Sequence, residues 1–276
     1  MTAFFTRVGS DPGLNTLDVN PCTLLDFARL ILPDGASFAG ETGGREVALV
    51  IFGGRGTVQV AGKTFARIGA RPNPFAGKPY AVYMPAGSAY TITAHGTLDA
   101  GLCSAPSDLA TDPYVITPDM VVQVDAGAAN FSRTLSNILT TSSQPELPAA
   151  RLLVGETFVP SGNWSTYPPH KHEVDNLPYE AHHEEMYYFR VNPPEGFGLC
   201  RHYSPERGYD QTYTISDSTI FMAPHGYHTT CSAPGYTNYF LWFLAGTGRT
   251  QAVAFDPALA WVQKAAPLIK QAERSR

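Results

Sequence analysis

Short apolar runs rich in Val, Ile, Tyr, Phe and Thr recur along most of this chain, separated by glycine and proline. The clearest runs are residues 47–52, 157–159, 186–189, 212–215 and 239–244. The 25 glycines and 23 prolines are spread through the sequence instead of marking one linker. Many short strands joined by tight turns are typical of a sandwich or a barrel. We therefore predict an all-β protein.

Two local patterns add detail to this prediction. Residues 47–52 and 57–60 flank a Gly-Gly-Arg-Gly turn, which predicts a β-hairpin. Near the end of the chain, Asp256 and Pro257 supply an N-cap and a proline at the first helical position. Apolar residues at 259, 262, 266 and 269 then form a helical stripe. A short C-terminal helix is expected there.

The chain also contains an internal repeat. Residues 82–87 resemble residues 220–226, because in each an apolar strand runs into a Pro-x-Gly turn. Gly87 and Gly226 lie about half the chain length apart. The simplest account is two copies of one β-barrel domain. We expect an N-terminal domain at residues 1–130 and a C-terminal domain at residues 131–276.

Seven of the eight histidines lie between His170 and His228. In an extended strand, His170 and His172 point to the same side, so both imidazoles can reach one point. Imidazole is the commonest protein ligand of transition metals. The pair Glu184-Glu185 follows, and His228 comes two residues after Gly226. This set predicts a divalent-metal site with three nitrogen ligands and one oxygen ligand. The first half has Ala89 where the second has His228, so we expect metal only in the C-terminal copy.

Strand alternation leaves some residues undecided. Glu184 and Glu185 point to opposite faces, and periodicity cannot choose between them. His182 and His183 lie in the polar insertion 173–183, which predicts solvent-exposed side chains. His225 is expected to flank the site, and the pattern does not assign His202 to any role.

Composition narrows the classes of function. A hydrophobic content of 43% and a charged content of 16% are typical of a soluble globular protein. The net charge of −5 favours neither nucleic acid nor an anionic surface as a partner. The longest apolar stretch, residues 239–246, is far below the ~20 residues of a membrane span. The four cysteines form no CxxC motif, and no secretion signal is visible, so we expect reduced thiols and a cytoplasmic location.

Several blocks resemble the signature blocks of the 5-deoxy-glucuronate isomerase family, a bicupin group. They are residues 167–172 (YPPHKH), 184–188 (EEMYY), 192–197 (NPPEGF) and 224–228 (PHGYH). The resemblance implies two cupin jelly-roll barrels and a divalent metal in the second, with zinc expected and manganese, iron or nickel as alternatives. It also implies a cytoplasmic role in myo-inositol catabolism.

By position in the motifs, the resemblance puts His170, His172, Glu185 and His228 in the ligand places. It thus resolves the choice between the two glutamates. The chain departs from the usual family pattern at Phe189 and Cys200, which leaves the exact uronate open.

The implied reaction converts 5-deoxy-glucuronate to 2-deoxy-5-keto-gluconate through an enediol. For the substrate carboxylate we expect Arg201, with Lys171 and Arg190 behind it, because the arginine fork suits carboxylates. For acid–base chemistry we expect Tyr187, on the strand face of Glu185. The alternatives are a surface ion pair for Arg201 and simple barrel packing for Tyr187.

Other functions on the same scaffold remain open. They are the 5-keto-4-deoxyuronate ketol-isomerase of pectin breakdown, a cupin dioxygenase and a non-catalytic sugar-binding bicupin. In each case the expected partner is a small molecule, a sugar acid under the main hypothesis. Since bicupins associate through sheet faces, a homo-oligomer is also an expectation.

Overall fold

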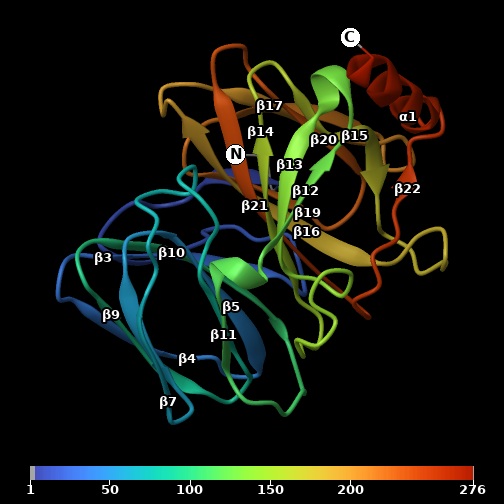
Figure 1. Ribbon diagram of the computed structural model, residues 1–276. Coiled ribbons are helices and arrows are strands. Elements are labelled where there is room, and N and C mark those ends of the chain that lie inside the picture. The colour runs from blue at the N-terminus through green and yellow to red at the C-terminus, as the bar shows by residue number, and fades with distance from the viewer. Residues whose placement is uncertain (1–3, 276) are drawn as a thin grey trace.

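The computed structural model describes residues 4–275 and contains two halves, each made of two facing β-sheets (Figure 1). Residues 1–3, which belong to the N-terminal stretch searched for a secretion signal, lie outside the described residues. The all-β prediction is confirmed. No helix in residues 4–275 has the length and apolar character needed to cross a membrane.

The first half contains a six-stranded sheet and a four-stranded sheet within the described residues. In sheet order, the six strands are β11 (Tyr114–Ile116), β8 (Ala81–Met84), β5 (Arg45–Gly53), β10 (Leu98–Pro106), β3 (Asp26–Leu32) and β2 (Gly13–Thr16). The four strands are β4 (Ser37–Glu41), β9 (Ala89–Ala94), β6 (Gly56–Val60) and β7 (Lys63–Ile68).

The second half contains a seven-stranded sheet and a five-stranded sheet within residues 4–275. The seven strands are β1 (Phe5–Arg7), β19 (Thr219–Ala223), β16 (His183–Asn192), β21 (Thr237–Gly246), β14 (Leu153–Val159), β13 (Arg133–Leu139) and β12 (Val122–Ala126). The five strands are β18 (Tyr209–Ile215), β17 (Gly198–Ser204), β20 (Tyr227–Ser232), β15 (Trp164–Lys171) and β22 (Ala254–Phe255). Short 3-10 turns, η1 (Pro118–Met120) and η2 (Ala129–Phe131), lie between the halves and beside β13.

The two halves repeat one topology. The order β8-β5-β10-β3-β2 in the first half corresponds to β19-β16-β21-β14-β13 in the second. The Pro-x-Gly turns noted in the sequence follow β8 and β19, so the internal repeat is structural. Strands β1 and β12 precede residue 131 yet belong to the second half's sheet, so the chain crosses the boundary predicted at residue 130.

The hairpin predicted at residues 47–60 is wrong, although both of its strands exist. Strand β5 pairs with β8 and β10, whereas β6 pairs with β7 and β9 in the opposite sheet. The turn at residues 53–56 therefore carries the chain from one sheet of the sandwich to the other. A two-sheet sandwich satisfies both strands' hydrogen bonds without pairing them to each other.

Strand β5 is apolar on both sides because both sides are covered. Val47, Leu49 and Ile51 point into the first half's own core. Ala48, Val50 and Phe52 point the other way, into a core shared with β16, β19 and β21 of the second half. The large sheets of the two halves thus pack face to face (Figure 1). Continuous apolar runs are expected for strands covered on both faces.

A pair of buried glutamates joins the halves reciprocally. In the first half, Glu46 accepts hydrogen bonds from the backbone N–H groups of Ala150, Arg151 and Leu152, at 2.7, 2.7 and 2.8 Å.

In the second half, Glu184 at the start of β16 accepts from the N–H groups of Thr23, Leu24 and Leu25, at 2.8, 2.7 and 3.1 Å. Each carboxylate therefore satisfies backbone donors of the opposite half, at the chain segment that leads into β14 or β3 respectively.

A buried ion pair crosses the same interface. Arg71 Nη1 donates to Glu156 Oε2 at 3.0 Å, and Nη2 donates to Oε1. The side chains are 3% and 0% exposed, and the Tyr239 hydroxyl also donates to Glu156 at 2.7 Å. The pair is fully desolvated, so its two members depend on each other.

We expect Arg71→Met to destabilise the protein by about 3–5 kcal/mol, because it leaves the Glu156 charge buried without its partner. Denaturant unfolding of the variant would measure this loss. The double variant Arg71→Met/Glu156→Gln should recover part of it, since the uncompensated charge is gone. Arg67→Met, at an exposed arginine, is the control. If Arg71→Met is as stable as the double variant, the unpaired Glu156 charge is not the cause of the lost stability.

The C-terminal helix α1 (Trp261–Arg274) exists but begins later than predicted. Residues 256–260 form a turn instead, closed by a hydrogen bond from the Ala260 backbone N–H to the Asp256 carbonyl at 2.8 Å, and both carboxylate oxygens of Asp256 are engaged. One accepts the backbone N–H of Ala258 at 2.9 Å, and the other accepts the Tyr203 hydroxyl. Val262, Ala266 and Ile269 of the predicted stripe do face the protein.

Candidate metal centre

Strand β15 ends with His170 and Lys171, directly before His172, and is bulged just before His170. Its pairing with β20 shifts register between Ser165 and His170. Thr166, inside the bulge, has a φ of 52°, which is a strained conformation for a β-branched residue. Bulges re-aim side chains and occur often beside active sites. Here the bulge sets His170 opposite His228 of β20.

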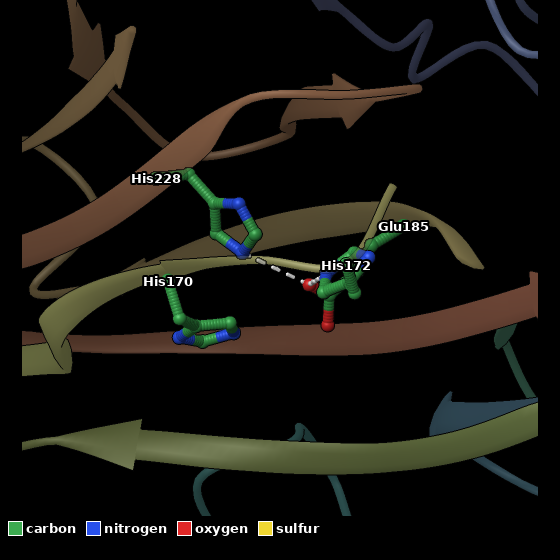
Figure 2. A group of neighbouring side chains, drawn as sticks. All are labelled: His170, His172, Glu185 and His228. Atoms are coloured by element: carbon green, nitrogen blue, oxygen red, sulfur yellow. Dashed lines mark hydrogen bonds and ion pairs between the residues drawn. The ribbon is translucent and has the colours of Figure 1, made fainter. Parts of the chain in front are cut away.

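Four side chains converge inside the second half: His170 of β15, His172 just after it, Glu185 of β16 and His228 of β20 (Figure 2). In the part of the chain that the structure describes, one nitrogen or oxygen of each of His170, His172, Glu185 and His228 lies within 4.8 Å of the others. Glu185 Oε2 is 3.0 Å from His172 Nε2 and 3.0 Å from His228 Nε2. The structure therefore brings together the four residues that the sequence assigned to metal.

The hydrogen bonds around these rings orient them towards a cation. His172 Nδ1 donates to the backbone carbonyl of His183 at 2.7 Å, and His228 Nδ1 faces the Gly226 carbonyl at 3.4 Å. A carbonyl accepts only, so Nδ1 carries the hydrogen and Nε2 presents a lone pair. Nε2 then faces a carboxylate oxygen, which is also an acceptor. Two acceptors 3.0 Å apart need a cation or a proton between them, so the residues fit a metal ion.

The electrostatics agree with this geometry. Burial alone would raise the pKa of Glu185, but the adjacent imidazoles of His172 and His228 outweigh it and leave the pKa well below its usual range. Burial, followed by the neighbouring His228 and His172, lowers the pKa of His170. An anionic carboxylate beside a neutral imidazole is the protonation state that metal binding requires.

Tyr187 is close to the same carboxylate. Its hydroxyl lies 3.0 Å from Glu185 Oε2 and 3.1 Å from His228 Nε2. Burial raises the pKa of Tyr187 well above its usual value, and the charge of Glu185 adds to the effect. Tyr187 is therefore a hydrogen donor at neutral pH rather than a base.

A cavity of about 180 Å³ opens beside the cluster. Three of the clustered residues line it, together with Tyr187 and His183. Its remaining wall is mostly apolar, with a few polar groups. These lining residues are Arg133, Leu135, Thr157, Ser165, Thr166, Phe240, Trp242, Leu244, Gln251, Ala252 and Val253.

Arg201 and Lys171, which the sequence favoured for the substrate carboxylate, do not line this cavity. Arg201 lies in an outer groove, 42% exposed, with Nε and Nη2 bound to Asp210 at 2.9 and 2.6 Å. Lys171 pairs with Glu173 and Glu180, each at 3.1 Å. Strand alternation explains both, since neighbours of inward residues on β15 and β17 point outward.

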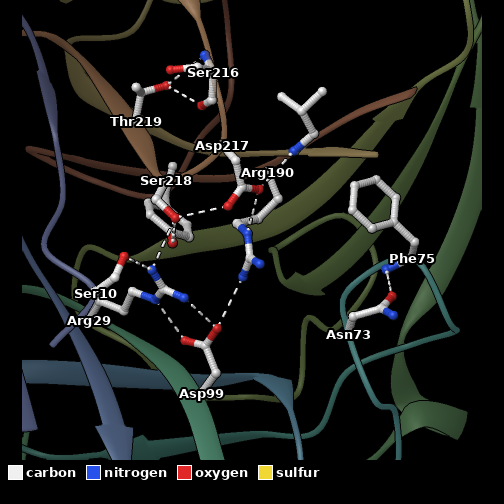
Figure 3. A network of polar contacts seen from close by, with 12 residues as sticks. Ser10, Arg29, Asn73, Phe75, Asp99, Arg190, Ser216, Asp217, Ser218 and Thr219 are labelled. Carbon is white, nitrogen blue, oxygen red and sulfur yellow. Dashed lines mark hydrogen bonds and ion pairs between the residues drawn. The ribbon is translucent and has the colours of Figure 1, made fainter. Parts of the chain in front are cut away.

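Arg190, the other arginine considered, belongs to a polar network between the halves (Figure 3). Its Nε donates to Asp217 at 2.8 Å, and its Nη1 donates to Asp99 of β10 at 3.0 Å. Asp99 also accepts two hydrogen bonds from Arg29, both at 2.8 Å. Arg190 is therefore held by carboxylates of both halves and does not face the cavity.

The remaining histidines differ from expectation in one case. His183 is not a solvated loop residue, since it begins β16, is 2% exposed and lines the cavity, with Nε2 bonded to the Gly248 carbonyl at 3.0 Å. His182 is partly exposed, as expected. His202 and His225 share the Tyr209 hydroxyl, at 2.9 Å each.

Phe189 and Cys200, the two departures from the family pattern, are fully buried in the apolar core of the second half. Neither lines the cavity described above. Their effect on a bound molecule would therefore be indirect, through packing.

Sequence reasoning missed the arginine that does line the cavity, Arg133 on β13. Its neighbourhood, residues 126–135, has no motif and follows a break in the repeat. The one available signal was alternation on β13, which places Arg133 and Leu135 on one face. Alternation can be used only when the bounds and the orientation of the strand are known. Trp242 was also missed, because it lies within a uniformly apolar run.

The fold and site together define a cupin protein with two domains. Solved structures agree on the fold: an oxalate decarboxylase from Lactobacillus farciminis superposes with a TM-score of 0.66 at 10% identity, covering 92% of this chain and 89% of that one. The structure of an iolb-like protein from Salmonella typhimurium superposes with a TM-score of 0.88 at 30% identity, covering 94% and 99%.

Sequence relatives are more specific. The model of the KduI/IolB family matches residues 10–262. A 5-deoxy-glucuronate isomerase of Geobacillus kaustophilus is 36% identical over 249 residues, covering 90% of this chain and 89% of the relative. One from Bacillus subtilis strain 168 is 37% identical, covering 87% and 88%. The chain belongs to the KduI/IolB family.

Proposed function

We propose that this protein is an aldose–ketose isomerase that converts 5-deoxy-glucuronate to 2-deoxy-5-keto-gluconate. The observation that carries the proposal is the convergence of three imidazoles and one carboxylate on a cavity of small-molecule size. Membership in the KduI/IolB family and the names of its relatives support the choice of substrate.

His170, His172, Glu185 and His228 would hold the metal, and we propose zinc, with manganese, iron or nickel as alternatives. A divalent cation at this place supplies Lewis-acid polarisation of a substrate oxygen. Three imidazoles with one carboxylate suit several of these metals, so the donor set leaves the choice among them open.

The chain's own groups act on the substrate's oxygens and protons. Tyr187 keeps its hydroxyl hydrogen, so it can donate to the oxygen on which charge develops as the enediol forms. The apolar wall formed by Leu135, Phe240 and Leu244 limits water around that charge. We therefore assign Tyr187 the role of proton donor at the substrate oxygen.

In this proposal the partner is a small sugar acid in cytoplasmic myo-inositol catabolism, with no role for nucleic acid or membrane. The first half, predicted as residues 1–130, contributes no ligand, since Val47 occupies the position in β5 that Glu185 occupies in β16. We also propose that the protein associates into a homo-oligomer. Measurements of its size in solution would test this association.

Turnover is tested by incubating the purified, metal-analysed protein with 5-deoxy-glucuronate in deuterated water and following the mixture by NMR. We expect the ketose product, with deuterium entering the carbon skeleton if the enediol exchanges its proton. Oxygen consumption should be absent, since isomerisation is redox-neutral overall. Stoichiometric oxygen uptake, or no product from metal-loaded protein, would refute the proposal.

A further inference from the structure

Arg133 brings a positive charge to the cavity without a carboxylate to balance it. Among the hydrogen bonds within residues 4–275, its guanidinium donates one, from Nη1 to the Phe131 carbonyl at 3.5 Å, which is long. No described Asp or Glu forms an ion pair with it. Its side chain is only partly exposed, and burial lowers its pKa.

Three arginines near the large sheets of the two halves have carboxylate partners. Arg29 and Arg190 bind Asp99, and Arg71 binds Glu156, in each case with a salt bridge of side-chain atoms. Arg45 and Arg249 form no ion pair within the described residues, but each donates two hydrogen bonds to backbone carbonyls, at 2.6 to 3.3 Å. A guanidinium that is mostly removed from water is normally paired. The missing partner of Arg133 is therefore expected to be an anion that enters the cavity.

Arg133 lines the same cavity as the metal cluster. His170 of the cluster and Tyr187 are also among the lining residues. A single small molecule could therefore contact Arg133 at one end and the four-residue cluster at the other.

The wall beside Arg133 is apolar. Leu135 lies two residues along β13 on the same face, Thr157 of β14 pairs with it, and Phe240 of β21 pairs with Thr157. In 5-deoxy-glucuronate, the carbon next to the carboxylate is the one that lacks a hydroxyl. A carboxylate held by Arg133 would put that methylene against this row, where a hydroxyl would lose its hydration.

The cavity holds one further donor without a partner. Trp242 is 6% exposed and lines the cavity, and its indole Nε1–H makes no hydrogen bond in the described structure. Buried indole N–H groups normally find an acceptor. A substrate hydroxyl or carbonyl between the two ends of the cavity would supply one.

We propose that Arg133 binds the carboxylate of the sugar acid, with the adjacent deoxy carbon packed against Leu135 and the aldehyde end at the metal cluster. This inference rests on the proposed function for the identity of the substrate. It assigns to Arg133 the role that the sequence gave to Arg201, and it explains how the site would discriminate against uronates that retain the 5-hydroxyl.

The test compares Arg133→Ala, Arg133→Lys and wild type with two substrates. One is 5-deoxy-glucuronate, and the other is the corresponding 5-deoxy-hexose, in which a hydroxymethyl group replaces the carboxylate. Arg133→Ala should lower kcat/KM for the acid by about 100-fold or more, mainly through KM, because a desolvated charge pair is lost. The kcat/KM of Arg133→Lys for the acid should lie between those of wild type and Arg133→Ala, since lysine keeps the charge but lacks the paired donors of the guanidinium.

The preference for the acid over the hexose should largely vanish in Arg133→Ala. Added guanidinium ion should restore part of the lost activity towards the acid.

Three controls distinguish loss of carboxylate binding from a general loss of the site. Arg207→Ala, at an exposed arginine of the second half, should behave like wild type. Metal content should stay equal in all variants, which excludes a general loss of the site. A loss from Arg201→Ala with none from Arg133→Ala, or an unchanged preference for the acid in Arg133→Ala, would overturn the assignment.

Binding measurements keep this test independent of turnover. Calorimetry of metal-free wild type with the acid should show binding that Arg133→Ala weakens about 100-fold. If wild type binds the acid through Arg133 but never isomerises it, the proposed function fails and the carboxylate site remains. If turnover is normal and Arg133→Ala binds like wild type, the carboxylate site fails and the proposed function remains.

Discussion

Replacement of His172 by alanine is expected to remove bound metal and turnover together while the protein stays folded. His172 supplies one of the four converging donors, and its Nδ1 is anchored to the His183 carbonyl at 2.7 Å. Loss of a supporting partner of a metal ligand typically costs 10–100-fold in metal affinity, so loss of the ligand itself should cost more than about 100-fold. Turnover should fall to background because the metal is lost.

The measurement is metal content by elemental analysis, beside turnover of 5-deoxy-glucuronate, on the same preparations. His182→Ala is a matched control, since it removes a partly exposed imidazole ten residues away and should change neither quantity. Circular dichroism would verify that both variants are folded. Full activity in metal-free His172→Ala protein would end the mechanism proposed above.

Replacement of Glu46 by glutamine is expected to cost about 3–5 kcal/mol of stability. The carboxylate is fully buried and accepts three backbone N–H groups of residues 150–152 and the Tyr83 hydroxyl at 2.6 Å. An amide offers one oxygen and turns an NH₂ group towards donors. Each buried donor left unpaired costs about 1–3 kcal/mol, so several such losses reach the expected size.

Against a typical total of about 5–15 kcal/mol, this loss is large and should lower Tm by roughly 10 °C. Calorimetry or denaturant unfolding would measure it, with Glu41→Gln, at an exposed glutamate of the same half, as the control. Metal content of the folded protein should not change, because Glu46 belongs to the first half. A Tm within about 1 °C of wild type would show that Glu46 does not hold the halves together.

The ligand set was the most predictable part of the site. His170 and His172 are two residues apart at the end of β15, and Glu185 follows on the next strand along the chain, so local periodicity already limits where they point. His228 follows a Pro-x-Gly turn that the sequence repeats. Such features depend on the pattern along the chain, which one sequence contains in full.

The errors came from contacts between distant segments. His183 lies in a polar stretch, yet it is buried because β16 begins there and pairs with β21. Residues 47–60 were predicted to form a hairpin because a strand, a tight turn and a second strand follow one another in the sequence. Strand β5 pairs instead with β8 and β10, and β6 pairs with β7 and β9. Except for β7, these partners lie 20 or more residues away, so the local pattern does not reveal them.

The choice between Glu184 and Glu185 illustrates the same limit. Alternation put them on opposite faces, and the resemblance to a family chose Glu185. The physical reason appears only in the folded protein. The face of Glu184 is covered by the other half, where Thr23 and Leu24 supply its hydrogen bonds, while the face of Glu185 lines a cavity.

The amino-acid sequence by itself indicated the all-β class, the doubling of the domain and the three histidines of the candidate metal site, because each depends on spacing of a few residues within one strand or turn. Tertiary structure alone decided which arginine faces the cavity, which histidines are buried and how the halves adhere. Those outcomes depend on which strands become neighbours. Along the chain, Arg133 and Arg201 look equivalent. They differ because the strand face of Arg133 lines an enclosed cavity, whereas that of Arg201 faces solvent.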